Sequence, residues 1–314
     1  MTRYKAVIAL IATALLAPGS LNPSVADTDT VTVSNSLTPL PALTDGPVPR
    51  NVTPTLGGII ADRPKPYKDR CHTQQNLTKS EADCRYGNLK SKTTIVLFGD
   101  SHALSWFPAI EKLAVTKNWK MISLTMSSCW PSDILAWNST TNLLMTNCSV
   151  WRKDTLREIA ALKPQMIFVA GTRGFTTVDE KFNILTGDSR TAEWEAGMLR
   201  TLDQLKRASK QVVYLGDTPI SVVDSPTCLK AHRNAIASCA TPYSKAVSTS
   251  WLSEEQHVAA TENVMWVDPT PWICSTDPCS PLSGKYVIFV DKGHLTASFA
   301  RTLESPLWAK VTSY

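Results

Sequence analysis

The chain has 314 residues, of which 43% are hydrophobic, 19% charged and 8% aromatic. This composition is typical of a globular protein with one large domain or two small ones, and it excludes a disordered, collagen-like or polytopic membrane protein. The formal charge of +5, from 32 Lys and Arg against 27 Asp and Glu, comes without a concentrated basic run, so nucleic-acid binding is not expected.

The N-terminal segment 1–26 has the features of a secretory signal peptide. Arg3 and Lys5 supply a positive start, residues 6–17 are apolar, and residues 24–26 (Ser-Val-Ala) offer a cleavage site with small side chains. A membrane span needs about 20 apolar residues, so this run is short for one. The alternatives are an uncleaved anchor or the end of a membrane helix in a clipped chain. Each case places the rest of the protein outside the cytoplasm, secreted or anchored at the outer face of the cytoplasmic membrane.

The remaining sequence predicts a polar linker and then one domain. Residues 27–66 are rich in Thr, Ser, Pro, Asn and Gly, which indicates a linker that wraps onto the domain edge. Short apolar runs then predict strands at residues 94–98, 121–125, 166–170, 212–215 and 264–267. Apolar stripes predict helices at residues 103–115, 150–162, 194–205 and 296–307. This alternation predicts a three-layer α/β domain over 67–314 with a mostly parallel central sheet.

Eight cysteines, an even number, indicate an oxidising compartment. Each lies near one other cysteine, and the neighbours are expected to pair, although eight cysteines allow many connectivities. The expected pairs are Cys71 with Cys84, Cys129 with Cys148, Cys228 with Cys239, and Cys274 with Cys279. The alternative is a zinc site, but the tight Cys-x2-Cys or His-x3-His spacing usual for zinc ligands is missing from the sequence, so no metal is expected.

The sequence Gly99-Asp100-Ser101-His102 follows the first predicted strand and precedes a helix. Sites in parallel α/β sheets form at the carboxyl ends of strands, so Ser101 would present its hydroxyl at the sheet edge. The first N–H groups of the helix would point at an oxyanion formed beside it, and Gly99 permits the sharp turn. The plainer interpretation is that Asp100 or Ser101 only caps the helix.

A second candidate set, Asp291 and His294, follows an apolar run near the C-terminus. A serine hydroxyl needs a base, and histidine, with a reference pKa of about 6.5, is suited to accept and return its proton. An aspartate three residues before the histidine can accept the other ring N–H and fix its orientation. The pattern predicts a triad of Ser101, His294 and Asp291. The alternative is a surface aspartate and a structural histidine. His102 is interpreted as either structural or in contact with substrate, because adjacent side chains on a helix diverge.

With these motifs the chain resembles the SGNH (GDSL-type) esterase superfamily. Within it, the chain is most similar to the extracytoplasmic SGNH domain fused to bacterial acyltransferase-3 membrane proteins. The resemblance covers about 67–314 and implies a flavodoxin-like sheet, the Ser101–His294–Asp291 triad, and acyl-ester chemistry on cell-envelope glycans. The residues that carry it are Val96 to Ala103, Trp106, Pro108-Ala109, Ser127 to Pro131, Gly216 to Pro219, Cys228-Leu229, Cys274 to Cys279, and Asp291 to Thr296.

The chain departs from that superfamily at the positions of the oxyanion donors. The usual donors include a Gly after the second strand and an Asn after the third, whereas the corresponding segments here are 125–129 (Thr-Met-Ser-Ser-Cys) and 169–174 (Val-Ala-Gly-Thr-Arg-Gly). The candidates to replace them are Ser101, Ser128, Thr172 and Arg173. Loss of one donor typically costs about 10²–10³ in rate, so weak hydrolysis is expected.

The leading functional expectation is an exported serine acyltransferase that acts on O-acetyl or other acyl groups of cell-envelope glycans, with no cofactor. The alternatives are a carbohydrate O-acetyl esterase with the same triad and a non-catalytic glycan-binding or accessory domain. Trp130, at a strand exit, is a candidate for stacking on a sugar, with core packing as the alternative. The resemblance implies a membrane acyltransferase partner on a separate polypeptide, or an exported acyl donor.

Overall fold

The computed structural model of the chain describes residues 39–313. The expected signal peptide at 1–26 and residues 27–38 of the expected linker lie outside the described residues. The residues from Leu40 onward cluster as one unit. No helix in the part that the structure describes is long and apolar enough to cross a membrane.

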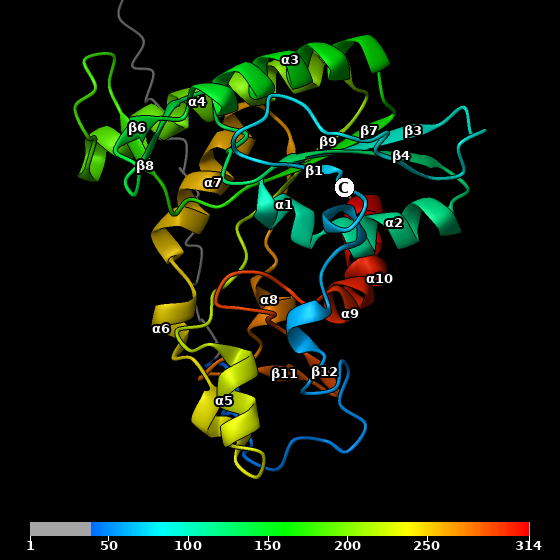
Figure 1. Ribbon diagram of the computed structural model, residues 1–314, viewed down its shortest axis with the longest axis vertical. Coiled ribbons are helices and arrows are strands. Elements are labelled where there is room, and N and C mark those ends of the chain that lie inside the picture. The colour runs from blue at the N-terminus through cyan, green and yellow to red at the C-terminus, as the bar shows by residue number, and fades with distance from the viewer. Residues whose placement is uncertain (1–38, 314) are drawn as a thin grey trace, which may run out of the picture. The chain divides into compact units, whose positions relative to one another are not determined.

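A seven-stranded sheet lies at the centre of this unit, with the order β1-β4-β3-β7-β9-β10 and with β2 also paired to β4 (Figure 1). Every pairing is parallel except that of β2 with β4. The strands are β1 (His72–Thr73), β2 (Arg85–Gly87), β3 (Thr94–Gly99), β4 (Lys120–Met126), β7 (Met166–Ala170), β9 (Val212–Leu215) and β10 (Met265–Val267). The five strands expected from the sequence are all present, and the mostly parallel sheet is confirmed.

Helices cover both faces of the sheet and make three layers (Figure 1). One face carries α1 (Ser101–Ser105), α2 (Phe107–Thr116), α9 (Ala297–Ala300) and α10 (Glu304–Thr312). The other carries α3 (Thr146–Leu162), α4 (Gly187–Ala208) and α7 (Thr249–Thr261). Shorter elements complete the unit: α5 (Ser225–Ala231), α6 (Tyr243–Ala246), α8 (Thr270–Ile273), β5 (Leu135–Asn138), β6 (Leu143–Leu144), β8 (Thr176–Val178), β11 (Leu282–Ser283), β12 (Tyr286–Val287), and the 3-10 turns η1 (Ile59–Ala61), η2 (Lys65–Tyr67), η3 (Ile236–Cys239) and η4 (Arg301–Leu303).

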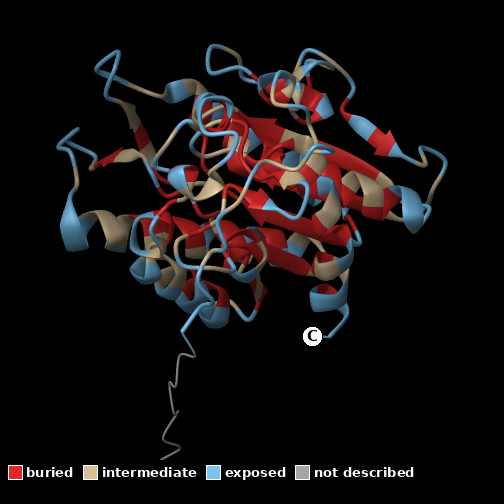
Figure 2. Ribbon diagram, turned by 90° about the horizontal axis from the view of Figure 1, so that it is seen from below, coloured by how far each residue is buried: buried red, intermediate tan, exposed pale blue. Residues whose placement is uncertain are grey.

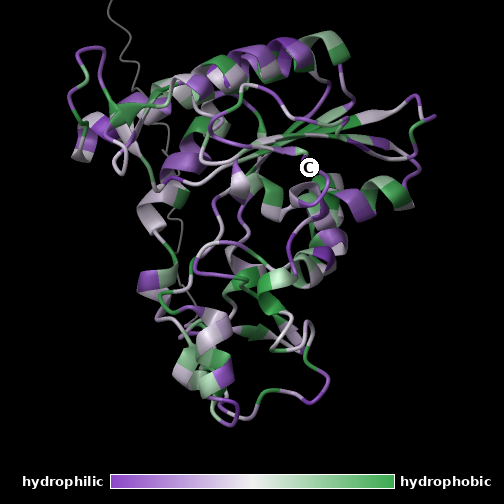
Figure 3. Ribbon diagram, viewed as in Figure 1, coloured by the Kyte–Doolittle hydropathy of each residue, from purple (hydrophilic) through white to green (hydrophobic). Residues whose placement is uncertain are grey.

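Successive residues of β3 point to opposite layers, as the period of two in a strand requires. Ile95 and Leu97 pack with the α2 and α10 layer, whereas Val96 and Phe98 pack with the α3 and α4 layer. All four side chains are fully buried. Figures 2 and 3 show the same arrangement, with central strands that are buried and hydrophobic and loops that are exposed. Burial on both faces explains why this strand is a continuous apolar run.

Two helices expected as single elements are broken, and a proline accounts for each break. The stretch expected at 103–115 is divided at Trp106, because Pro108 has no N–H to donate to the carbonyl four residues earlier. The stretch expected at 296–307 is divided into α9, η4 and α10, and Pro306 stands in the first turn of α10. Both prolines occupy the first turn of the helix that follows the break, where a missing N–H costs little.

Four disulfide bonds join the neighbouring cysteines as expected: Cys71–Cys84, Cys129–Cys148, Cys228–Cys239 and Cys274–Cys279. The first links the segments of β1 and β2 at the sheet edge. The second links the loop after β4 to α3. Four disulfides in one chain are typical of a protein that folds outside the cytoplasm.

The segment before β1 packs against the rest of the unit. Ile59 is fully buried in a small apolar cluster with Leu229, Leu282 and Val287. The backbone of Thr53 exchanges hydrogen bonds with the β12 region. As a result, the part of the chain just before residue 67 lies next to the C-terminal loop that holds Asp291 and His294.

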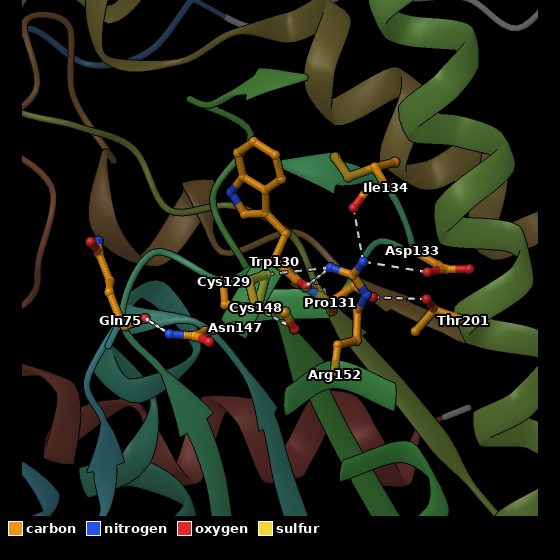
Figure 4. The surroundings of a disulfide bond; sticks show 10 residues. All are labelled: Gln75, Cys129, Trp130, Pro131, Asp133, Ile134, Asn147, Cys148, Arg152 and Thr201. Atoms are coloured by element: carbon orange, nitrogen blue, oxygen red, sulfur yellow. Dashed lines mark hydrogen bonds and ion pairs between the residues drawn. A yellow bond between two sulfur atoms is a disulfide. The ribbon is translucent and has the colours of Figure 1, made fainter. Parts of the chain in front are cut away.

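The loop after β4 is held by a buried arginine as well as by a disulfide (Figure 4). The Arg152 guanidinium donates hydrogen bonds to the carbonyls of Trp130 (3.4 Å) and Ile134 (2.8 Å) and pairs with Asp133 at 3.3 Å. The Thr201 hydroxyl donates to the Pro131 carbonyl at 2.8 Å. These contacts fix residues 129–134, the loop segment directly after Ser128.

We expect Arg152→Met to lower the free energy of unfolding by about 2–4 kcal/mol, since it leaves two buried carbonyls without a donor. The matched control is Arg157→Met, which lies five residues further along α3. The Arg157 side chain is 68% exposed and pairs with Asp154, so its loss should cost less than about 1 kcal/mol. Urea unfolding of both variants checks this, and equal losses would contradict the assigned role of Arg152.

Candidate active site

The backbone around Ser101 forms a strand–turn–helix junction at the carboxyl end of β3. Gly99 has φ +143°, and a Cβ there would collide with the carbonyl oxygen of Ala170 on the neighbouring strand, so only glycine fits. Asp100 caps α1 by accepting the N–H of His102 at 2.8 Å, and it also accepts the N–H of Thr172 at 2.9 Å. Burial raises the pKa of Asp100 to about 6. The capping role therefore belongs to Asp100, and Ser101 is the first residue of the helix.

The structure brings Ser101, His294 and Asp291 together. The Nε2 atom of His294 lies 2.9 Å from Ser101 Oγ, and its Nδ1 atom lies 2.9 and 3.0 Å from the two carboxylate oxygens of Asp291. Asp291 also accepts the N–H groups of Gly293 and His294. Although burial opposes ionisation, these hydrogen bonds and the nearby His294 hold the pKa of Asp291 well below its usual range. The three side chains thus form a hydrogen-bonded chain that ends in an ionised carboxylate.

Arg63 contacts the same carboxylate and was not anticipated from the sequence. Its Nη2 atom lies 3.0 Å from Asp291 Oδ2, and both side chains are about one-third exposed. Arg63 comes from residues 27–66, which were expected to be a linker, and no local motif marks it. Only the packing of that segment against the domain shows the contact.

A second histidine–carboxylate pair lies beside the first. His102 Nδ1 is 2.6 Å from an oxygen of Asp217, which follows β9, and the rings of His102 and His294 are 5.2 Å apart, edge to face. Asp217 also accepts the N–H groups of Arg173 and Thr218. Burial opposes protonation of His102, but the charge and hydrogen bond of Asp217 outweigh it and raise the pKa of His102 to about 9. His102 is therefore a cation at neutral pH.

This pair predicts a pH dependence of stability. The folded-state pKa of His102 is raised to about 9 from a reference near 6.5, so its contribution is complete below about pH 6.5 and is lost as the pH rises through 9. That shift corresponds to about 3 kcal/mol. Burial and the Asp217 charge raise the pKa of Glu255 to about 8. The stability that Glu255 contributes is therefore also lost as the pH rises through 8. We expect the free energy of unfolding to fall between pH 6.5 and 9.

The variant Asp217→Asn tests this dependence, because it removes the charge that raises both pKa values. Urea unfolding at several pH values should give a shallower fall for Asp217→Asn than for the wild type. The control Asp154→Asn changes a carboxylate that is more than half exposed and should keep the wild-type slope. A slope that Asp217→Asn leaves unaltered would contradict the assignment of a cationic His102.

The candidate oxyanion donors fall into two groups. The N–H groups of Thr172 and Arg173 already donate to Asp100 and Asp217, so Thr172 could act only through its hydroxyl. The Arg173 guanidinium is buried, hydrogen-bonded to Glu254 and stacked on Trp194, which leaves it unsuited to this role. In the described part of the chain, no protein acceptor takes the N–H of Ser101 or Ser128. The Ser128 backbone has φ +53°, a conformation that favours glycine.

Trp130 is almost wholly buried, with 3% of its surface exposed. Its ring packs edge to face on Phe175 and lines a very small cavity with Thr172 and Arg173. Figure 4 shows the indole directed away from the Arg152 guanidinium. A sugar needs an open ring face, which Trp130 does not offer, so substrate contact by Trp130 stays a prediction without support from this geometry. Among residues 39–313, no group of three or more His, Cys, Asp or Glu side chains is arranged to hold a metal ion.

A family model described as "SGNH domain (fused to AT3 domains)" matches residues 70–309, about three-quarters of the chain. The chain belongs to this SGNH family. The resemblance seen in the sequence is therefore confirmed, and the three-layer α/β architecture is the SGNH fold.

Among solved structures, the SGNH chain is similar to the periplasmic domain of the lipopolysaccharide acetyltransferase of Salmonella ser. Paratyphi A. That match has a TM-score of 0.58 and 14% identity, and it covers 82% of this chain and 94% of the other. A mutant of the acetyl-xylooligosaccharide esterase Axe2 from a Geobacillus species gives a TM-score of 0.41 and 12% identity, and the match covers 71% of this chain and 96% of the other. No curated protein sequence matches the chain as a relative.

Proposed function

We propose that this SGNH protein is an extracytoplasmic serine acyltransferase that acts on acyl esters of cell-envelope glycans. The observation that carries the proposal is the hydrogen-bonded chain from Ser101 Oγ through His294 to Asp291, at the carboxyl end of a parallel strand. A hydroxyl paired with an imidazole whose other nitrogen faces a carboxylate is the arrangement that activates a serine nucleophile.

In the first half of the reaction, Ser101 Oγ attacks the carbonyl carbon of the acyl donor while His294 Nε2 takes the hydroxyl proton. Asp291 stabilises the imidazolium that forms and keeps the ring oriented. The tetrahedral intermediate then collapses. The bond to the donor oxygen breaks, His294 returns the proton to that oxygen, and an acyl-Ser101 ester remains.

In the second half, a sugar hydroxyl attacks the acyl-Ser101 carbonyl and gives its proton to His294. Collapse of the second intermediate releases the acylated sugar and returns the proton to Ser101. Water in place of the sugar would make the same sequence an ester hydrolysis. Exclusion of water from the acyl-enzyme is therefore what separates a transferase from an esterase.

The oxyanion formed in each half needs hydrogen-bond donors, and we assign this role to the N–H groups of Ser101 and Ser128, with the Thr172 hydroxyl as a third donor. His102 is the substrate contact that we retain. Its Nδ1–H donates to Asp217, which leaves its Nε2–H as the donor for substrate beside Ser101 and His294.

The family and the disulfides support a proposal for the location and the partner. The family model describes domains fused to AT3 domains, and the Salmonella neighbour is the periplasmic domain of an acetyltransferase. We infer an extracytoplasmic location, either secreted or anchored at the outer face of the membrane. We further infer a supply of acyl groups from a membrane acyltransferase or from an exported donor.

A product assay tests the proposal against its two alternatives. The purified chain is given p-nitrophenyl acetate with a panel of neutral oligosaccharides, and the products are identified by mass spectrometry. Acetylated sugar is expected for the transferase, whereas acetate alone would show an esterase. A non-catalytic glycan-binding domain would release acetate at the same trace rate in the wild type and in His294→Ala.

A further inference from the structure

A cavity of about 280 Å³ lies next to the candidate active site, under the loop that follows β9. This volume is near the lower end of the range for small-molecule sites, roughly 300–1,000 Å³, and suits a single ring rather than a long chain. The loop after β9, the α6 and α7 segments, and the start of α8 form its walls (Figure 1). Exposed residues at 244 and 245 mark the side on which the cavity meets solvent.

The cavity is joined to the candidate active site through Asp217, which lines the cavity and holds His102, the residue after Ser101. The loops themselves lie side by side, because the N–H of Ser221 donates to the carbonyl of Lys292 at 2.8 Å. A group bound in the cavity would therefore lie close to His102 and His294.

Buried polar groups without protein partners line this cavity. Thr218 and Thr270 are each 4% exposed, and neither hydroxyl has a hydrogen-bond partner in the described chain. Burial of an unsatisfied hydroxyl costs free energy, so such groups are normally paired with water or a ligand. Glu255, which is fully buried, lines the same cavity. Burial raises its pKa to about 8, so at neutral pH it is a carboxylic acid that can both donate and accept.

Apolar side chains form much of the remaining wall, with Ser244, Lys245 and Ser248 as its other polar residues. Trp251, Leu252, Val247 and Ile220 line the cavity together with the polar groups. A few fixed polar groups among aromatic and aliphatic walls are the usual composition of a ligand site. A pyranose ring matches both the polar groups and the apolar side chains of the wall. Its hydroxyls donate and accept hydrogen bonds, and its C–H face packs on an aromatic ring.

We propose that the cavity between the β9 loop and α7 is a subsite for one neutral sugar ring of the glycan substrate. The hydroxyls of Thr218 and Thr270 bind the ring hydroxyls, and Trp251 packs against its apolar face. A neutral sugar is favoured over an acidic one because the Asp217 carboxylate in the wall would repel a second anion. The Lys245 cation of the lining is exposed, and the buried polar groups Thr218, Thr270 and protonated Glu255 are uncharged. An acyl chain would leave the threonine hydroxyls unpaired. This assignment rests on the proposed function.

The test measures binding without turnover, in the full chain carrying Ser101→Ala. The probes are the methyl glycosides of glucose, galactose, mannose and rhamnose, with methyl glucuronide as the charged counterpart, titrated by calorimetry. We expect saturable binding of at least one neutral glycoside. The affinity should fall at least tenfold on Trp251→Ala and on Thr218→Val, which removes the hydroxyl but keeps the shape. The control Trp308→Ala changes a half-buried tryptophan of α10, on the other face of the sheet, and should bind as before.

Three results would overturn the subsite: no saturable binding of any neutral glycoside, equal or tighter binding of methyl glucuronide, or variants that bind as well as the parent. Hydrolysis of p-nitrophenyl acetate, which carries no sugar, distinguishes failure of the subsite from failure of the proposed function. With Ser101 intact, the wild-type chain and the Trp308→Ala control should hydrolyse it at the same rate. Absence of esterase activity together with glycoside binding would remove the proposed chemistry and leave the subsite.

Discussion

Replacing Ser101 with alanine should reduce the hydrolysis of p-nitrophenyl acetate by about 10³-fold or more. The reason is that Ser101 Oγ is the hydroxyl held 2.9 Å from His294 Nε2, and without it no acyl-enzyme can form. Loss of the nucleophile in a Ser-His-Asp site leaves only the background rate supplied by binding and oxyanion donors. The rate of p-nitrophenol release under excess substrate gives the comparison.

Ser149→Ala is the matched control for this prediction. Ser149 lies on α3 and, like Ser101, is neither buried nor fully exposed. It should keep the wild-type rate, and circular dichroism should show that both variants are folded. If Ser101→Ala released p-nitrophenol as fast as the control, the assignment of Ser101 as the nucleophile would be wrong.

The second large effect is expected for Asp291→Asn, which should lower the same rate by about 10²–10⁴-fold. The amide keeps the size of the side chain but offers one acceptor and one donor group. It therefore cannot accept from the His294 ring, the N–H groups of Gly293 and His294, and Arg63 at once, as the carboxylate does. The imidazole loses its orientation and the charge that stabilises its protonated form.

Asp154→Asn provides the matched control, because Asp154 is an exposed carboxylate on α3 that pairs with Arg157. It should keep full activity. A small effect of Asp291→Asn, within threefold of this control, would show that the carboxylate only holds the loop in place. Retention of the unfolding free energy by Asp291→Asn would separate a loss of chemistry from a loss of folding.

The sequence was sufficient to predict the central part of the fold. The strands β3, β7, β9 and β10 are mostly apolar runs because both of their faces are buried, and such runs are visible without a structure. The strand β4 is also largely apolar, although Ser123 and Thr125 lie buried within it. The strands β1 and β2 were not predicted, since two or three residues at a sheet edge carry no periodic signal. The broken helices around Pro108 and Pro306 could have been predicted, because proline is restricted to the first turn.

Some residues of the candidate site could be predicted from the sequence, and others could not. Ser101, His294 and Asp291 could be named because each lies in a short motif directly after a strand or an apolar run. Arg63 and Asp217 could not be assigned roles, since Arg63 reaches Asp291 only through the packing of a segment with no motif. The occupation of the Thr172 and Arg173 N–H groups by Asp100 and Asp217 is also a property of the folded loops, and it narrows the set of oxyanion donors.

Covalent labelling of Ser101 tests the central claim most directly. The wild-type chain is treated with a fluorophosphonate probe, which reacts only with an activated serine, and the labelled peptide is identified by mass spectrometry. The account predicts stoichiometric labelling of Ser101 in the wild type and at least a hundredfold slower labelling in His294→Ala, because His294 is the base that activates the hydroxyl. Absence of labelling, labelling at another residue, or equal rates in the two proteins would contradict it.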